Sequence, residues 1–151
     1  LAYSVGLLTP EQAIVAFTTS MAAASADTMA SEIGVLSPSP VLITNPRKVV
    51  EPGVDGGISF EGLTASFLSA VSISMVAYAG FLVLIEENHA FYSSIELKYL
   101  FISVFFGFFG SVLDSFLGAT LQNRGFLSNN GVNLSSISIS VLLSLLILNI
   151  F

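Results

Sequence analysis

The sequence predicts an all-α fold, a polytopic bundle of transmembrane helices, and its composition carries that prediction. Hydrophobic residues make up 54% of the 151-residue chain, and charged residues make up only 9%. Soluble domains contain about 25% charged residues. A chain of this size keeps roughly 30% of its unfolded surface in contact with water after folding. With a mean hydropathy of +0.88, that much apolar surface requires a bilayer around it.

Several classes of partner and site are excluded by the same composition. The net charge of -6 argues against a nucleic-acid partner, which requires a basic surface. The chain has no cysteine and a single histidine, so disulfides, thiolate zinc sites, cysteine nucleophiles and His-rich metal sites are ruled out. The run from Leu1 to Leu8 resembles the end of an earlier apolar segment. We therefore expect residues 1–151 to form a single integral membrane domain, a fragment whose N-terminal helices are missing.

The first predicted helix runs from about Pro10 to Ile33. Thr9 supplies a hydroxyl cap, Pro10 fits the first turn, and Glu11 lies near the positive end of the helix dipole. With its polar end included, this helix reaches the roughly 20 residues that a bilayer core requires. Small residues recur at every fourth position and give a smooth stripe for close helix packing: Ala22, Ala26, Ala30 and Gly34.

Asp27 and Glu32 stand in this first helix, and Asp114 stands in the third. Charged groups inside membrane helices are costly, so they usually face other helices or water and usually have a function. We therefore interpret these three carboxylates as candidate functional groups. Two alternatives stay open: Asp27 and Asp114 are structural groups held by neighbouring hydroxyls, or Glu32 is a solvated helix end.

Residues 34–58 are expected to form a loop, because prolines forbid a continuous helix: Pro38, Pro40, Pro46 and Pro52. The loop contains Arg47 and Lys48, two of the four basic residues in the chain. The run Gly53–Ser59 then opens the next helix, and a Gly-rich turn at a helix N-terminus can present backbone N–H groups to an anion. Taken alone this turn is a weak signal, since no Gly-Lys-Ser/Thr Walker motif follows it.

Three further helices are predicted, over about Ser59 to Ile85, Ser93 to Gln122 and Val132 to Phe151. A polar connection containing Arg124 separates the last two. The third helix combines phenylalanines, which supply lipid or packing contacts, with a small and polar stripe at every fourth position: Gly110, Asp114, Gly118 and Gln122.

The distribution of basic residues predicts the orientation. The first and third connections, 34–58 and 123–131, emerge on one side and hold Arg47, Lys48 and Arg124. By the positive-inside rule both loops face the cytoplasm, although the basic pair can serve topology alone. The candidate groups Asp27, Glu32, Asp114 and Gln122 lie at the matching helix ends. We therefore expect the loop 34–58 to be part of a cytosolic active site.

Three runs together resemble a known family: Ala26–Gly34, Gly53–Ser59 and Gly110–Gln122. The family is that of transmembrane protein 19, which includes the plastid phytyl-phosphate kinase. The first run and the loop are also distantly similar to dolichol kinases and CDP-diacylglycerol synthases, which use CTP and magnesium at a cytosolic membrane face. This chain departs from the family pattern at Met29, Asp55 and Leu63, where Trp, Asn and Thr are expected.

The resemblance implies an integral membrane prenyl-phosphate kinase that transfers a phosphoryl group from a nucleoside triphosphate to a lipid phosphate or a prenol. CTP is the first expectation for the donor, and Mg²⁺, a hard cation that prefers carboxylate and water oxygens, is the expected cofactor. The catalytic groups and metal ligands are then Asp27, Glu32 and Asp114. The nucleotide and phosphate contacts are then Arg47, Lys48, Gly53, Asp55, Gly56, Gly57, Ser59 and Gln122.

The alternative function is a cation-coupled membrane transporter, in which Asp27 and Asp114 on facing helices bind the cation. Such sites usually lie near the membrane midplane. Asp27 is only about two helical turns from the predicted cytosolic helix end, which favours the enzyme. A purely structural membrane subunit would leave the carboxylates and the glycine turn unexplained. The oligomeric state stays open.

Overall fold

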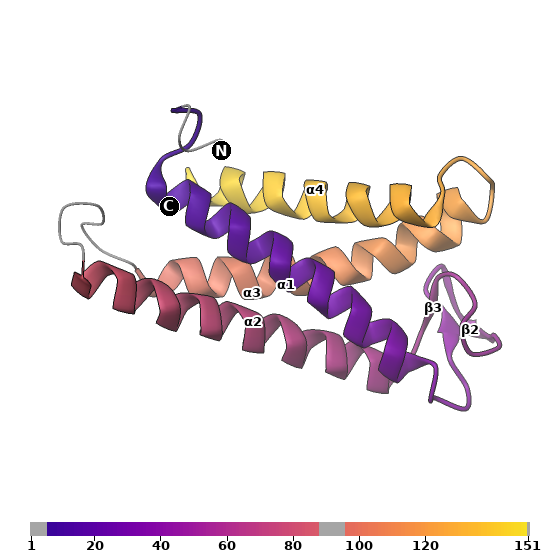
Figure 1. Ribbon diagram of the computed structural model, residues 1–151. Coiled ribbons are helices and arrows are strands. Elements are labelled where there is room, and N and C mark those ends of the chain that lie inside the picture. The colour runs from indigo at the N-terminus through magenta and orange to yellow at the C-terminus, as the bar shows by residue number, and fades with distance from the viewer. Residues whose placement is uncertain (1–5, 88–95, 151) are drawn as a thin grey trace.

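The computed structural model describes residues 6–87 and 96–150, which form four α-helices and one small sheet (Figure 1). The helices are α1 (Pro10–Gly34), α2 (Phe60–Glu87), α3 (Leu97–Leu117) and α4 (Asn129–Leu148), and a π-helical turn, η1 (Gly118–Gln122), continues α3. The strands are β1 (Val41–Leu42), β2 (Asn45–Val49) and β3 (Gly57–Ile58). The predicted fold class, an all-α membrane bundle, is confirmed.

Helices α1 and α3 form the centre of the bundle, because each of them contacts the other three helices (Figure 1). Small residues allow this close packing. A Cβ added to Gly107 of α3 would lie 2.6 Å from the Cβ of Ala22, and one added to Gly110 would lie 2.8 Å from that of Ala23. The predicted small-residue stripe of α1 is therefore a helix-packing surface, as is typical of membrane bundles.

The same stripe continues towards the sheet, where α1 crosses α2. A Cβ added to Gly62 of α2 would lie 2.9 Å from the carbonyl oxygen of Ala30 and 3.1 Å from the Cα of Gly34. Ala30 and Gly34 thus approach α2, whereas Ala22 lies against α3. One helical stripe serves two different neighbours along its length.

The predicted start of α1 is confirmed by a capping box. The Thr9 hydroxyl accepts from the Gln12 backbone N–H at 3.3 Å, and the Gln12 side chain accepts from the Thr9 N–H at 2.9 Å. These bonds satisfy two of the N–H groups that a helix leaves unpaired at its start. The amide of Gln12 also donates to Asn149 at 2.9 Å, which joins the start of α1 to the end of α4.

Within residues 6–87 and 96–150, three helical segments are long and apolar enough to cross a membrane: Phe60–Val83, Leu97–Gln122 and Asn129–Leu148. Helix α1 has sufficient length at 25 residues, but it is rich in Ala, Ser and Thr and is not among these segments. Phe101, Phe105 and Phe116 of α3 expose large apolar surfaces, whereas Phe106 is buried. The phenylalanines therefore serve both lipid and packing contacts, as predicted.

The loop 34–58 differs from the prediction, because it contains an antiparallel sheet with strand order β2-β1-β3. Val41 pairs with Val49 on one side and with Ile58 on the other. Pro46 is tolerated because β2 is an edge strand, where a missing N–H removes no bond inside the sheet. The strands were missed because β1 and β3 have two residues each, too few for any alternation to be recognised.

Helix α4 begins earlier than the predicted Val132, because the Ser128 side chain accepts from the Gly131 N–H at 3.2 Å and caps the helix there. The predicted start of the third helix at Ser93 lies outside the described residues. The sheet and the turn between α3 and α4 lie at one end of the bundle, and the start of α1 and the end of α4 lie at the other (Figure 1). The prediction that the first and third connections share a side is therefore confirmed.

Candidate functional site

A cavity of about 360 Å³ lies at the sheet end of the bundle. All four helices, η1 and the loop before α2 contribute to its walls. Most of the residues singled out in the sequence line this one cavity: Asp27, Glu32, Gly53, Asp55, Gly56, Gly57, Ser59, Asp114 and Gln122. Segments that are far apart in the chain thus meet at one site.

The cavity is lined by four carboxylates, those of Asp27, Glu32, Asp55 and Asp114. Among the residues that the structure describes, its lining contains no lysine, arginine or histidine. We call it the acidic cavity. An environment of this kind attracts cations and repels free anions.

Asp114 is held by two side chains of α4. Ser136, which is only 2% exposed, has one hydroxyl hydrogen for two acceptors, Asp114 Oδ2 at 2.9 Å and the Asn133 backbone carbonyl at 3.0 Å. With the Asn133 side-chain amide assigned so that its nitrogen faces the carboxylate, Asn133 donates to the same carboxylate oxygen at 2.9 Å. Hydrogen bonds to an ionised carboxylate are stronger than those between neutral groups, so α4 fixes the orientation of this group.

Asp27 of α1 lines the same cavity as Asp114 of α3. The neighbouring hydroxyls do not hold the Asp27 carboxylate. Thr28 donates to the Ala24 carbonyl at 3.0 Å, and Ser31 donates to the Asp27 carbonyl at 3.0 Å. Since a hydroxyl has one hydrogen to donate, both are committed to the backbone. The Asp27 carboxylate is therefore directed to the cavity without a fixed donor from these two residues.

The loop Gly53–Gly57, which we call the Gly loop, forms one wall of the cavity. Gly53 and Gly56 adopt φ angles of +86° and +79°, which L-residues with side chains rarely do. The Gly56 backbone also packs closely on η1, since an added Cβ would lie 2.8 Å from the Ala119 Cα. Only glycine fits this approach.

Two of the predicted phosphate contacts already have partners. The Gly57 N–H donates to the Val54 carbonyl at 2.8 Å, so it is used within the Gly loop. The Ser59 hydroxyl accepts from the Gly62 N–H at 3.0 Å and thus caps the start of α2. Both residues line the cavity. The Gly57 N–H is committed within the loop, whereas the Ser59 hydroxyl acts only as an acceptor in its bond with Gly62 and keeps a hydrogen to donate.

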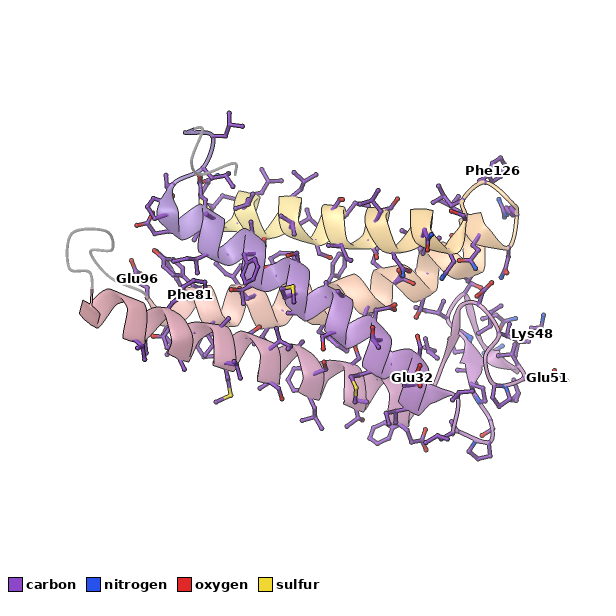
Figure 2. All side chains as sticks on the ribbon, in the orientation of Figure 1. Glu32, Lys48, Glu51, Phe81, Glu96 and Phe126 are labelled. Carbon is purple, nitrogen blue, oxygen red and sulfur yellow. The ribbon has the colours of Figure 1, made fainter. Side chains whose placement is uncertain are left out.

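Arg47 and Lys48 do not line the acidic cavity. Both lie on β2, all five residues of which are exposed. Figure 2 shows Lys48 and Glu51 on the outer side of the sheet, whereas Glu32 lies at the end of α1 next to it. A direct contact of the basic pair with a phosphate in this cavity stays a prediction that the geometry does not favour.

The carboxylates that line the acidic cavity are oxygen ligands of the kind that Mg²⁺ prefers. Within residues 6–87 and 96–150, no three His, Cys, Asp or Glu side chains group closely enough to hold a metal ion alone. Mg²⁺ usually takes one or two protein carboxylates and completes its shell with water and substrate phosphates. Asp27 and Asp114 fit that use, and Glu32 is an exposed carboxylate on the same cavity. Magnesium therefore stays a prediction compatible with the residues present.

Comparison with known proteins now gives the family. The model of the family described as "Integral membrane protein DUF92" matches residues 2–141. The chain belongs to the DUF92 family.

This DUF92 chain is 33% identical over 136 residues to the "Uncharacterized membrane protein MJ0933" of Methanocaldococcus jannaschii, a match that covers 89% of this chain and 51% of the relative. It is 34% identical over 110 residues to "Protein PGR" of Arabidopsis thaliana, covering 71% of this chain and 37% of the relative. The chain thus spans about half or less of the length of these relatives. No solved structure matches it. Neither relative is described as a dolichol kinase or a CDP-diacylglycerol synthase, so that distant likeness stays a prediction.

The DUF92 site contains partners of Asp114 that sequence reasoning missed. Asn129 and Asn133 line the cavity, and Asn133 and Ser136 hold the carboxylate. A signal was present, because Asn129, Asn133, Ser136 and Ser140 recur on one face of an otherwise apolar helix. Which carboxylate that face meets depends on how α4 docks on α3, and the sequence does not specify this.

Proposed function

We propose that this DUF92 protein transfers a phosphoryl group from a nucleoside triphosphate, with CTP as the expected donor, to a prenyl phosphate or prenol at the membrane surface. One observation carries the proposal. Carboxylates of two non-adjacent helices, Asp27 of α1 and Asp114 of α3, line one end cavity together with the Gly loop. Phosphoryl transfer mainly requires positioning and charge neutralisation, and this arrangement suits both.

The negative charge of the cavity lining determines the form in which a nucleotide can enter. Free phosphates are repelled by four carboxylates with no basic partner in the lining. A nucleotide therefore enters as a complex with a cation. Asp27 and Asp114 would hold Mg²⁺, which when bound supplies neutralisation of the phosphate charge. Ser136 and Asn133 keep the Asp114 carboxylate aimed at the cavity.

A prenyl monophosphate can react at this site without a general base, provided that the same cation offsets its negative charge. One of its phosphate oxygens is already an anionic nucleophile, so it attacks the γ-phosphorus directly. The bond from the γ-phosphorus to the bridging oxygen breaks, and the nucleoside diphosphate leaves with its electron pair. No general base is needed, which agrees with a lining that contains no histidine among the described residues. An alcohol would instead require one carboxylate to accept its proton.

A groove beside the cavity supports a lipid acceptor. It has a volume of about 700 Å³, lies between α1 and α2, and is lined by residues that include Met29, Ile33 and Leu68. Met29 and Ile33 alternate with the cavity residues Thr28 and Glu32 on the last turns of α1. We assign this groove to the isoprenoid tail, because a headgroup in the cavity would leave its tail within reach of it.

The test uses the full-length protein in detergent with Mg²⁺, CTP or ATP, and labelled prenyl monophosphates. We expect a prenyl diphosphate product, and we expect Asp27→Asn and Asp114→Asn each to abolish it. Glu51→Gln is the matched control, because Glu51 is exposed and does not line the cavity. Full activity in either Asn variant would remove that residue from the site. Absence of product with every acceptor would refute the proposal.

A second candidate, cation-coupled transport, is favoured by one specific observation. The bundle interior is rich in buried hydroxyls, and those of Thr19, Ser66 and Ser74 have no hydrogen-bond partner within the described part of the chain. A polar interior of this kind suits the passage of a hydrated ion. Cation flux into proteoliposomes that depends on Asp27 and Asp114, with no lipid product, would favour the transporter.

A further inference from the structure

We propose that Asp55 and Gln122 are a positioning pair: their hydrogen bond latches the Gly loop against η1 as one wall of the acidic cavity, and its rupture widens the access of polar ligands to the cavity. The sequence assigned both residues to phosphate binding. The proposal rests on the acidic cavity being the site of the proposed function, although the latch itself is measured without substrate.

The contacts at the cavity wall carry this inference. Gln122 Nε2 donates to Asp55 Oδ2 at 2.8 Å. The Asn123 side chain donates to the Asp55 backbone carbonyl at 3.4 Å. Both bonds join the Gly loop to the end of α3. The Asp55 carboxylate and the Gln122 amide are therefore bonded to each other, which leaves both side chains poorly placed to bind a phosphate.

The end of α3 is shaped for this contact. Its last turn is π-helical, with the Asn123 N–H donating to the Gly118 carbonyl at 3.2 Å. Single π-helical turns occur frequently at functional sites, and they offset the side chains that follow from their α-helical positions. Here the side chains of Gln122 and Asn123 both donate hydrogen bonds to Asp55. The next residue of the Gly loop, Gly56, packs on Ala119 of η1.

The Gly loop is open around Gly53 and held more closely at Gly56. An added Cβ at Gly53 would meet nothing within 4 Å, and both Gly53 and Gly56 have positive φ angles. Asp55 itself is exposed. On the sheet side, the loop is held by the Ile43 N–H, which donates to the Gly56 carbonyl at 2.9 Å. The loop can therefore remain on the sheet while its contact with η1 is broken.

The test measures access to the cavity with a water-soluble thiol reagent. The chain has no cysteine, so Ser115→Cys places a single thiol on the cavity lining beside Asp114. With the latch intact we expect slow modification. Gln122→Leu, and Gln122→Glu by repulsion from Asp55, should raise the modification rate roughly tenfold or more, the factor expected from losing a hydrogen bond to a charged group.

Two further variants separate a latch from a merely structural role. Asp55→Asn keeps an acceptor oxygen for Gln122, so the rate should stay at the level of the parent protein. Asp55→Asn combined with Gln122→Glu reverses the bond, with the Asn amide donating to the Glu carboxylate, and should restore slow modification. An unchanged rate in Gln122→Leu and Gln122→Glu, or no rescue by the double variant, would overturn the proposal.

A thiol at Val15 controls for unfolding, because Val15 is fully buried and should stay protected in every latch variant. Modification of Val15→Cys in the Gln122 variants would mean that they unfold, and it would also overturn a local latch. The assay contains no nucleotide or lipid. Latch behaviour without any lipid product would refute the proposed function alone, and lipid product without latch behaviour would refute the latch alone.

Discussion

Gly107 and Ala22 set how closely α1 approaches α3. We predict that the paired substitutions Gly107→Ala and Ala22→Gly separate the free-energy cost of a steric clash from the change in helix propensity at each site. A Cβ at Gly107 would lie 2.6 Å from the Ala22 Cβ, whereas carbon atoms in contact prefer about 3.5–4.0 Å. Gly107→Ala must therefore push the helices apart by about 1 Å. Overpacking of this kind typically costs about 1–3 kcal/mol of unfolding free energy.

Ala22→Gly removes the opposing Cβ, after which the nearest Ala22 atom to the new methyl would lie 3.3 Å away. Helix propensities belong to single sites and cancel in a double-mutant cycle. We therefore expect a favourable coupling of about 1–3 kcal/mol between Gly107→Ala and Ala22→Gly. The measurement is unfolding of the purified protein in mixed detergent micelles, followed by circular dichroism. Additivity within about 0.5 kcal/mol would refute the reasoning.

Three other predictions address the cavity directly. Ser136→Ala and Asn133→Leu should each lower phosphoryl-transfer activity about 10- to 100-fold, since a hydrogen bond to a charged group is worth about 1.5–3 kcal/mol; Ser135→Ala, whose hydroxyl donates to the Gly131 carbonyl, is the control. The double variant Arg47→Gln/Lys48→Gln should change the nucleotide KM less than about threefold at 0.15 M salt, because exposed charges outside the cavity are largely screened. A larger rise in KM would mean that these two residues do contact the nucleotide. Chelation of divalent cations should stop the reaction and Mg²⁺ should restore it, whereas activity in excess chelator would contradict the need for a cation.

Much of the fold could be predicted from the sequence, because each helix carries its own signals. Thr9 and Gln12 form the capping box that starts α1, and long apolar runs define α2, α3 and α4. Spacing at every fourth residue located the packing stripe of α1, which does not depend on the identity of the neighbour. The small sheet was missed because its strands depend on pairing between Val41 and both Val49 and Ile58, a non-local event.

The sequence predicted which side chains meet at the candidate site, but it predicted less well what each of them does there. Helix ends and connectivity sufficed to bring Asp27 and Asp114 to one end of the bundle. The roles depend on pairings that no local pattern encodes. Gln122 bonds to Asp55, and Ser136 bonds to Asp114. Arg47 and Lys48 were predicted to bind phosphate because they are positively charged. They lie instead on β2, an exposed edge strand of a sheet that the sequence did not reveal.

The position of the acidic cavity along α1 bears on the choice between enzyme and transporter. Asp27 precedes the end of α1 at Gly34 by about 10 Å, at a rise of 1.5 Å per residue. At that depth a water-soluble nucleotide can reach the carboxylates, while Met29 and Ile33, on neighbouring positions of α1, line the groove together with Leu68 of α2. An ion carrier needs its carboxylates near the midplane, accessible from both sides in turn. A kinase of lipid phosphates needs one site where an aqueous donor meets a membrane-bound acceptor, and a cavity at the bundle end beside an apolar groove meets that requirement.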